Sequence, residues 1–332
     1  MDKISLILIT FAWKEKYKMT GTEKRKGIIL RRGGLLALSL LLMSLALLPA
    51  GSAQAADSKW INQIWDKYKA YNKKTVSNYN AYMKKATDTY KAYLQKQNSR
   101  LDELESIVLE DQKKWNEWLK ADLAKLTEKY GDNRELRDAL NQYERDINPN
   151  SLSSPMGLYS RAANRNSLSS TMGIYDRAIN ENALTSYMAE YKKAVDPDSL
   201  TSPAFALKKT VSDRYLTSPM YLLMKNSSTD YLTSPLYRYS IGKISKSKAQ
   251  QQYSKLYKDY TAQISRDTAA YKKEIAEKVA SADLKIQKLY LETIQALEKQ
   301  RNATLQNISD QRKKMGEEGL TWEPLLVIPA KK

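Results

Sequence analysis

Six consecutive copies of a 16-residue unit fill residues 150–245, and the last two read RYLTSPMYLLMKNSST (residues 214–229) and DYLTSPLYRYSIGKIS (residues 230–245). Every unit has Leu at its third position and Ser at its fifth, and four of the six have Pro at the sixth. A fixed period without insertions indicates one small structural unit that is stacked repeatedly. The units begin at Asn150, Asn166, Asn182, Asp198, Arg214 and Asp230.

The invariant serine predicts the start of a helix in each unit. A serine side chain at the N-cap accepts a hydrogen bond from a backbone N–H that has no partner within the helix. Proline at the first helical position loses an N–H that needs no partner, so Ser-Pro is typical of a helix start. We therefore predict N-caps at Ser154, Ser170, Ser186, Ser202, Ser218 and Ser234.

The remainder of each unit predicts a short amphipathic helix and a connector. Apolar residues occupy the seventh, tenth and fourteenth positions, as in Met172, Tyr175 and Ile179, which is the spacing of one helical face. A helix of about 8 to 10 residues is not stable alone in water, so the units must pack on each other or on another part of the chain. We expect a helical array, and the alternative is a compact solenoid that contains β-strands.

The segments before and after the repeat share an 11-residue period. This period corresponds to about 3.67 residues per turn, so an apolar stripe that follows it stays on one face of a long α-helix. Two helical arms of about 70 residues are therefore predicted. The stripe of the first arm is Tyr71, Tyr82, Tyr93, Leu104, Trp115 and Leu126, and that of the second is Tyr253, Ile264, Ile275, Ile286, Leu297 and Ile308.

The predicted fold is all-α, and the repeat array joins the end of the first arm to the start of the second. We expect the arms to pair within one chain as an antiparallel coiled-coil rod, and the alternative is a parallel pairing of each arm between two chains. The predicted organisation is a signal peptide (1–55), first arm (56–130), short helix and linker (131–149), six repeats (150–245), second arm (246–316) and tail (317–332).

Residues 1–55 predict a cleaved secretory signal peptide. Basic residues from Lys24 to Arg32 precede an apolar run from Leu35 to Leu48, and Ala53-Gln54-Ala55 fits a cleavage site, with cleavage after Ala55. The apolar run is shorter than the roughly 20 residues that span a bilayer, so we expect export rather than an anchor, and no transmembrane segment in the mature chain. Met19 is an alternative start of the chain. The expected location is secreted or at the cell surface.

The composition excludes several kinds of active site. The chain has no cysteine and no histidine, which removes disulfides, thiol nucleophiles, zinc–thiolate sites and the commonest general base. Neither a paired acidic motif nor a glycine-rich phosphate loop is recognisable. We therefore expect no catalytic residues, no cofactor, no metal and no small-molecule substrate.

The start of the first arm is strongly basic, with ten basic and two acidic side chains in residues 58–100. Basic residues interleaved with aromatic ones can hold nucleic acid, an anionic membrane or a wall polymer. We expect an anionic cell-wall polymer or self-association, and do not expect nucleic acid. The aromatic residues of this arm fall mostly on the 11-residue stripe and are predicted core. The candidate polyanion-binding residues are Lys67, Lys69, Lys73, Lys74, Lys84 and Lys85.

Three classes of function fit these patterns. The first is a non-enzymatic structural or binding protein, because a rod displays a repeated module. The second is a membrane-active helical protein similar in layout to pore-forming toxins, although no mature segment has a long apolar run. The third is a glycan-acting enzyme, which would need carboxylates brought together from distant positions. We expect the first.

Overall fold

The computed structural model describes residues 57–325, which contain helices and connectors and no strand. The prediction of an all-α fold is confirmed, and the β-containing solenoid is wrong for this part of the chain. The predicted signal peptide, residues 1–55, lies outside the described residues, as do residues 326–332 of the tail.

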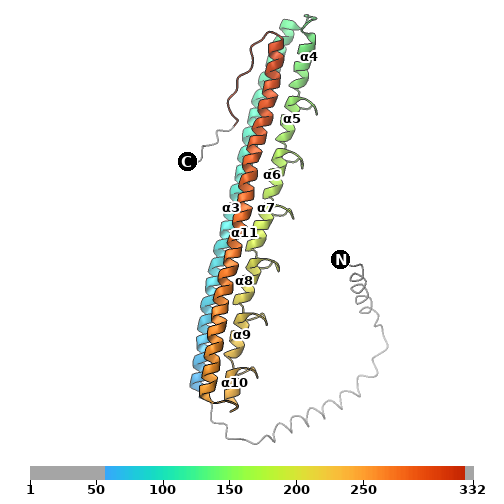
Figure 1. Ribbon diagram of the computed structural model, residues 1–332. Coiled ribbons are helices and arrows are strands. Elements are labelled where there is room, and N and C mark those ends of the chain that lie inside the picture. Colours follow the sequence, from blue (N-terminus) through green and yellow to red (C-terminus); the bar gives the residue numbers. More distant parts are fainter. Residues whose placement is uncertain (1–56, 326–332) are drawn as a thin grey trace, which may run out of the picture. The chain divides into compact units, whose positions relative to one another are not determined.

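Two long helices and seven short ones make up the described part of the chain (Figure 1). The long helices are α3, Ser58–Tyr130, and α11, Lys246–Lys314. The short helix α4, Arg137–Asp146, follows α3. One further short helix belongs to each repeat unit: α5 Pro155–Ala162, α6 Thr171–Ile179, α7 Tyr187–Val195, α8 Pro203–Val211, α9 Pro219–Asn226 and α10 Pro235–Ser240.

The fifth-position serines of the repeat lie at the N-caps of these six helices. Each hydroxyl accepts a hydrogen bond from a backbone N–H three residues later, at 2.8–2.9 Å. Each also donates to the carbonyl six residues earlier, at 2.5–2.6 Å, next to the end of the preceding helix. All six side chains are buried, at 0–7% exposure. One hydroxyl therefore connects the end of each helix to the start of the next.

The two long helices run parallel, so the prediction of an antiparallel pair is wrong. Lys246 at the start of α11 donates to Asp57, the N-cap of α3, at 2.6 Å. Further along, residues that meet between α3 and α11 are again about 190 apart in sequence, as in Asp111 and Arg301. A constant difference in residue number is the property of a parallel pair, whereas an antiparallel pair has a constant sum.

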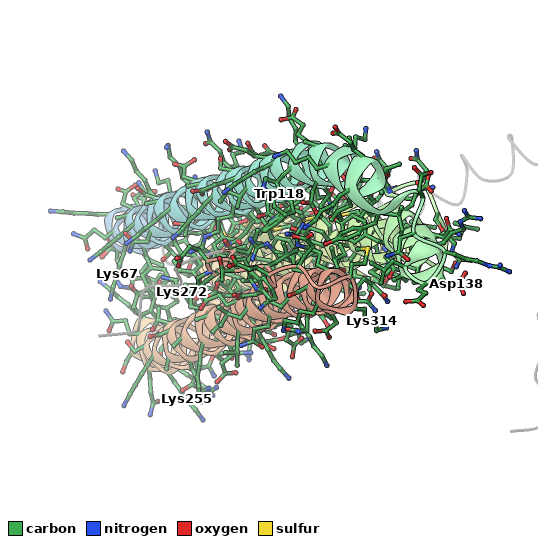
Figure 2. All side chains as sticks on the ribbon, turned by 90° about the horizontal axis from the view of Figure 1, so that it is seen from above. Lys67, Trp118, Asp138, Lys255, Lys272 and Lys314 are labelled. Atoms are coloured by element: carbon green, nitrogen blue, oxygen red, sulfur yellow. The ribbon has the colours of Figure 1, made fainter. Side chains whose placement is uncertain are left out.

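The repeat array is the reason for the parallel direction. The prediction treated the array as a joint at one end, but α4–α10 run the whole way back along the rod (Figure 1). The chain therefore passes up α3, down the repeats and up α11, and three segments lie side by side in the rod. In the end view of Figure 2, Lys67 of α3 and Lys255 of α11 both lie toward the far end of their helices, while Trp118 and Lys314 lie nearer the viewer.

One repeat unit covers the same length of rod as eleven residues of a long helix, about 16.5 Å at about 1.5 Å per residue. Met220 packs in one cluster with Ile264 of α11. One unit later, Leu236 packs with Tyr253, which lies one stripe position before Ile264 in α11. The six units thus match the six positions of the α11 stripe, all of which are buried.

Buried polar junctions tie the three segments together at the end where α3 finishes. Asp111 of α3 receives two hydrogen bonds from Arg301 of α11, both at 2.8 Å, and one from Tyr159 of α5 at 3.0 Å. The same kind of junction recurs one 11-residue period further along α3 and α11. There Asp122 of α3 meets Arg312 of α11 and Tyr143 of α4.

Comparison of these two junctions shows that α4 belongs to a seventh, degenerate repeat unit. From the first junction to the second, each long helix advances by one 11-residue period and the tyrosine moves back by one 16-residue unit. The unit spans residues 134–149, with Leu136 at its third position and Tyr143 at its tenth. Asp138 stands where the other units have serine, and α4 has no side-chain N-cap bond. The sequence pattern alone predicts only a short helix and a linker in this segment.

We expect a distance measurement to distinguish the two arrangements of the arms. Spin labels on Lys84→Cys and Glu274→Cys should lie closer together than labels on Lys84→Cys and Glu292→Cys. In the parallel rod Lys84 is level with Glu274, and Glu292 lies about 27 Å further along the axis. In the antiparallel rod Lys84 would be level with Glu292, so the order of the two distances would be reversed. The chain has no cysteine of its own to interfere.

Substitution of a capping serine should destabilise the rod. Ser218 is only 1% exposed, and Ser218→Ala removes the acceptor for the Tyr221 N–H and the donor to the Ser212 carbonyl. The free energy of unfolding should fall by about 1 to 3 kcal/mol in urea denaturation. The neighbouring Thr217 is exposed, so Thr217→Ala should change it by less than about 0.5 kcal/mol. Equal losses in the two variants would contradict the capping role.

Candidate functional site

Positive charge is concentrated at the end of the rod where both long helices begin. Residues 58–100 of α3 carry ten basic and two acidic side chains, and residues 248–290 of α11, which lie beside them, carry nine and five. The last three repeat units, residues 198–245, add six and three. We call these three segments together the basic end. The rest of the rod, residues 101–197 and 291–320, has 18 basic and 22 acidic side chains.

The parallel direction changes which residues lie beside the basic start of α3 but alters their net charge little, since residues 248–290 have nine basic and five acidic side chains. An antiparallel rod would have placed the basic start of α3 beside residues 281–316, which have seven basic and four acidic side chains. It would also have placed the basic start of α11 against the acidic second half of α3. The lysines of α11 at the basic end were missed as candidates for this reason, since the same 11-residue period fits either direction.

The six lysines predicted to bind a polyanion are all exposed on α3 within the basic end. Three already have partners. Lys69 is paired with Asp66 at 2.8 Å, Lys84 is paired with Asp88 at 2.7 Å, and the ammonium of Lys67 lies 4.0 Å from the centre of the Tyr257 ring. The other three have no carboxylate within ion-pair distance among residues 57–325: these are Lys73, Lys74 and Lys85.

The hydroxyls of the repeat differ in their access to a ligand. The capping serines are buried, so their hydroxyls serve the fold. The fourth position of every unit also has a hydroxyl, and these side chains are exposed: Ser153, Ser169, Thr185, Thr201, Thr217 and Thr233.

A cleft of about 780 Å³ lies at the opposite end, where the segment after α11 folds back along the rod (Figure 1). Trp115 and Trp118 of α3 line it, together with Arg301, Arg312 and residues 318–325. The Trp322 indole donates to Asn302 at 2.9 Å, and Arg301 donates to the carbonyl of residue 323 at 2.8 Å. The returning segment is therefore held along α11.

Both arginines of this cleft are engaged within the chain, whereas Glu110, Lys114, Glu318 and Glu323, which also line it, form no ion pair among residues 57–325. Arg301 and Arg312 are engaged with Asp111 and Asp122, whose side chains are each only 12% exposed. Trp118 is 43% exposed and carries Arg312 on its ring, 5.3 Å from the ring centre. The cleft therefore holds the returning segment and does not present a pair of free carboxylates from the long helices.

Most tyrosines are part of the core or border it, and several have a raised pKa. Burial is the main cause for Tyr68, Tyr90, Tyr143 and Tyr159, and hydrogen bonds to carboxylates add to it. Burial raises the pKa of Tyr253 to about 12. These tyrosines hold their protons more tightly in the folded protein than in the unfolded chain.

Within residues 57–325, no cluster of three acidic side chains is arranged to hold a metal ion. No helix in the same range is long and apolar enough to cross a membrane. No protein family, curated protein or solved structure matches this chain.

The raised tyrosine pKa values predict a loss of stability in alkaline solution. A phenol whose pKa is higher in the folded state contributes its full stabilisation below the unfolded pKa of about 10. That contribution is lost as the pH rises from about 10 through the folded pKa, about 12 for Tyr253. Urea denaturation at pH 8 and pH 11 should therefore show a lower free energy of unfolding at pH 11. In Tyr253→Phe the difference between the two pH values should be smaller, and an unchanged difference would contradict the assignment to Tyr253.

Proposed function

We propose that this chain is a secreted or cell-surface binding protein, without enzymatic activity, that attaches to an anionic wall polymer through its basic end. The observation that carries the proposal is the separation of charge along the rod. The basic end has 25 basic and ten acidic side chains, while the rest of the rod has more acidic than basic ones. A linear polyanion would thus be attracted to one end of the molecule and not to the other.

The rigidity of the rod supports this binding mode. The first half of α3 is continuous helix, so its lysines are held along about 65 Å without loops between them. Lysines held on such a surface can contact several charges of one polymer at once, and each contact raises the effective concentration for the next. Exposed lysines contribute little to a core, so they are free to serve binding.

Export and the absence of catalysis are further parts of the proposal. The pattern of residues 1–55 supports passage through a membrane, which would bring the protein to the wall. Asp111 in the end cleft and Asp122 one period further along α3 are each engaged with an arginine, which supports a structural role for that region.

A comparison of two charge reversals on the same helix tests the proposal. Lys73, Lys74 and Lys85 changed to Glu should weaken binding to isolated cell walls by about tenfold or more. Changing Lys113, Lys114 and Lys120 to Glu alters the net charge equally, but at the other end, and should have little effect. All six side chains are exposed, so circular dichroism should show unchanged helicity.

Salt and wall composition provide the controls. Binding of the unchanged protein should weaken strongly near 1 M salt, where the screening length falls to about 3 Å from about 8 Å at physiological salt. Walls stripped of their anionic polymer should bind poorly. Equal losses in the two triple variants, or equal binding to stripped walls, would refute attachment through the basic end.

A further inference from the structure

Only two positions of the 16-residue unit hold the same residue in all six copies, the leucine at the third and the serine at the fifth. The serine is explained by its two buried hydrogen bonds. The leucine is not explained by the fold, because its side chain is 68–99% exposed in every copy. These residues are Leu152, Leu168, Leu184, Leu200, Leu216 and Leu232.

The positions of the unit that face the core vary more than this exposed one. The seventh position holds Met, Ala or Leu, the tenth holds Tyr or Leu, and the fourteenth holds Ala, Ile, Val or Ser in the five copies where it is buried. The copies have therefore diverged even where they pack in the core. A large apolar residue that stays unchanged on the surface while the core varies indicates a contact outside the folded chain.

A second surface position of the unit is almost always basic. The twelfth residue is Arg or Lys in five of the six copies: Arg161, Arg177, Lys193, Lys209 and Lys225. In the first two units this basic residue lies next to the leucine. Arg161 donates a hydrogen bond to the Leu152 carbonyl, and Arg177 donates one to the Leu168 carbonyl. We call the six leucines and these five basic residues the leucine edge.

The leucine edge is a row along one side of the rod. The connectors that contain the leucines project from the same side of the repeat array in Figure 1. Successive leucines are separated by one unit, about 16.5 Å of rod. Five acidic residues also lie on the connectors between the repeat helices. Glu181 and Asp213 accept hydrogen bonds from Tyr90 and Tyr68 of α3, and Asp196 accepts one from the Asp198 N–H at 2.9 Å. Asp198 is paired with Lys208 at 2.7 Å, and Asp230 accepts a hydrogen bond from Ser228 at 2.8 Å.

We infer that the leucine edge is a docking surface for an anionic lipid bilayer, on which the rod lies lengthwise. Leucines held on projecting connectors enter the boundary between headgroups and acyl chains, while the neighbouring cations stay at the anionic headgroups. Lys209 and Lys225 belong both to the leucine edge and to the basic end, but no residue of the edge lies on α3, so the contact does not depend on polymer binding by the lysines of α3.

Charge and spacing favour a bilayer over a protein partner. Two copies of this chain joined edge to edge would bring two rows of cations together, which is repulsive. A helix bound in a groove needs apolar anchors one or two turns apart, about 5 to 11 Å, and the leucines are more widely spaced than that. A fluid bilayer accepts isolated leucines at any spacing.

A fluorophore on the edge itself tests this inference in the full chain. Because the protein has no cysteine, Leu184→Cys can be labelled at one site with an environment-sensitive dye. Leu184 is 99% exposed, so its replacement should not disturb the core. With vesicles of phosphatidylcholine and phosphatidylglycerol, the dye emission should shift to shorter wavelength. The same dye on Asn80→Cys, an exposed site on α3, should not shift.

The position of the dye separates edge contact from any binding by the apolar run in residues 35–48. Vesicles of phosphatidylcholine alone should give little shift at position 184. Changing the five basic residues of the edge to Gln should raise the lipid concentration needed for half of the shift by about tenfold. Absence of a shift on anionic vesicles would overturn the inference, with circular dichroism confirming a folded protein. A shift that appears without lipid and grows with protein concentration would also overturn it, in favour of a second copy as the occupant.

Discussion

The rod depends on the match between two lengths, that of one 16-residue repeat unit and that of one 11-residue period, or three turns, of a long helix. A short helix and its connector advance along the rod by as much as the apolar stripe of each long helix, so every unit meets the same kind of surface. A short helix alone would not be stable, and the long helices would leave their stripes in water. In each 11-residue length of the rod, the repeat helix covers the apolar stripes of the long helices. Those stripes in turn bury the apolar face of the repeat helix and stabilise it.

Polar junctions favour the parallel direction of α3 and α11, which the apolar stripes alone do not specify. The Asp111–Arg301–Tyr159 junction joins α3, α11 and a repeat helix, and it recurs one period further along each long helix. Breaking one member would leave buried charge without a partner, which is costly. The direction has an electrostatic consequence as well, since both basic halves of the long helices come together at one end. The charge separation along the molecule comes mainly from composition, above all from the ten basic and two acidic side chains at the start of α3.

Local features were predictable from the sequence, and the path of the chain was not. The serine caps and the 11-residue stripes follow from rules that act within a few turns, and the structure has helices at those places. The direction of α11 could not be read from its stripe, because a period is unchanged when a helix is reversed. The unit at 134–149 escaped notice because Asp138 stands where the others have serine. The residues that could have revealed this unit are Leu136, Tyr143 and Ile147, which match the third, tenth and fourteenth positions of the repeat. The exposure of the repeated leucines could not be predicted either, because a sequence pattern shows that a residue is apolar and not whether it is buried.

The match between the repeat unit and the helical period also restricts how the length of this molecule can change. Adding one layer requires one whole unit in the repeat and one whole period in each long helix, at three separate places in the gene. Duplication of a repeat unit alone would produce a helix with no stripe to cover, and lengthening one long helix would expose a stripe to water. The rod can therefore grow or shrink only in coordinated steps of about 16.5 Å. Its length should resist change more strongly than its surface residues do.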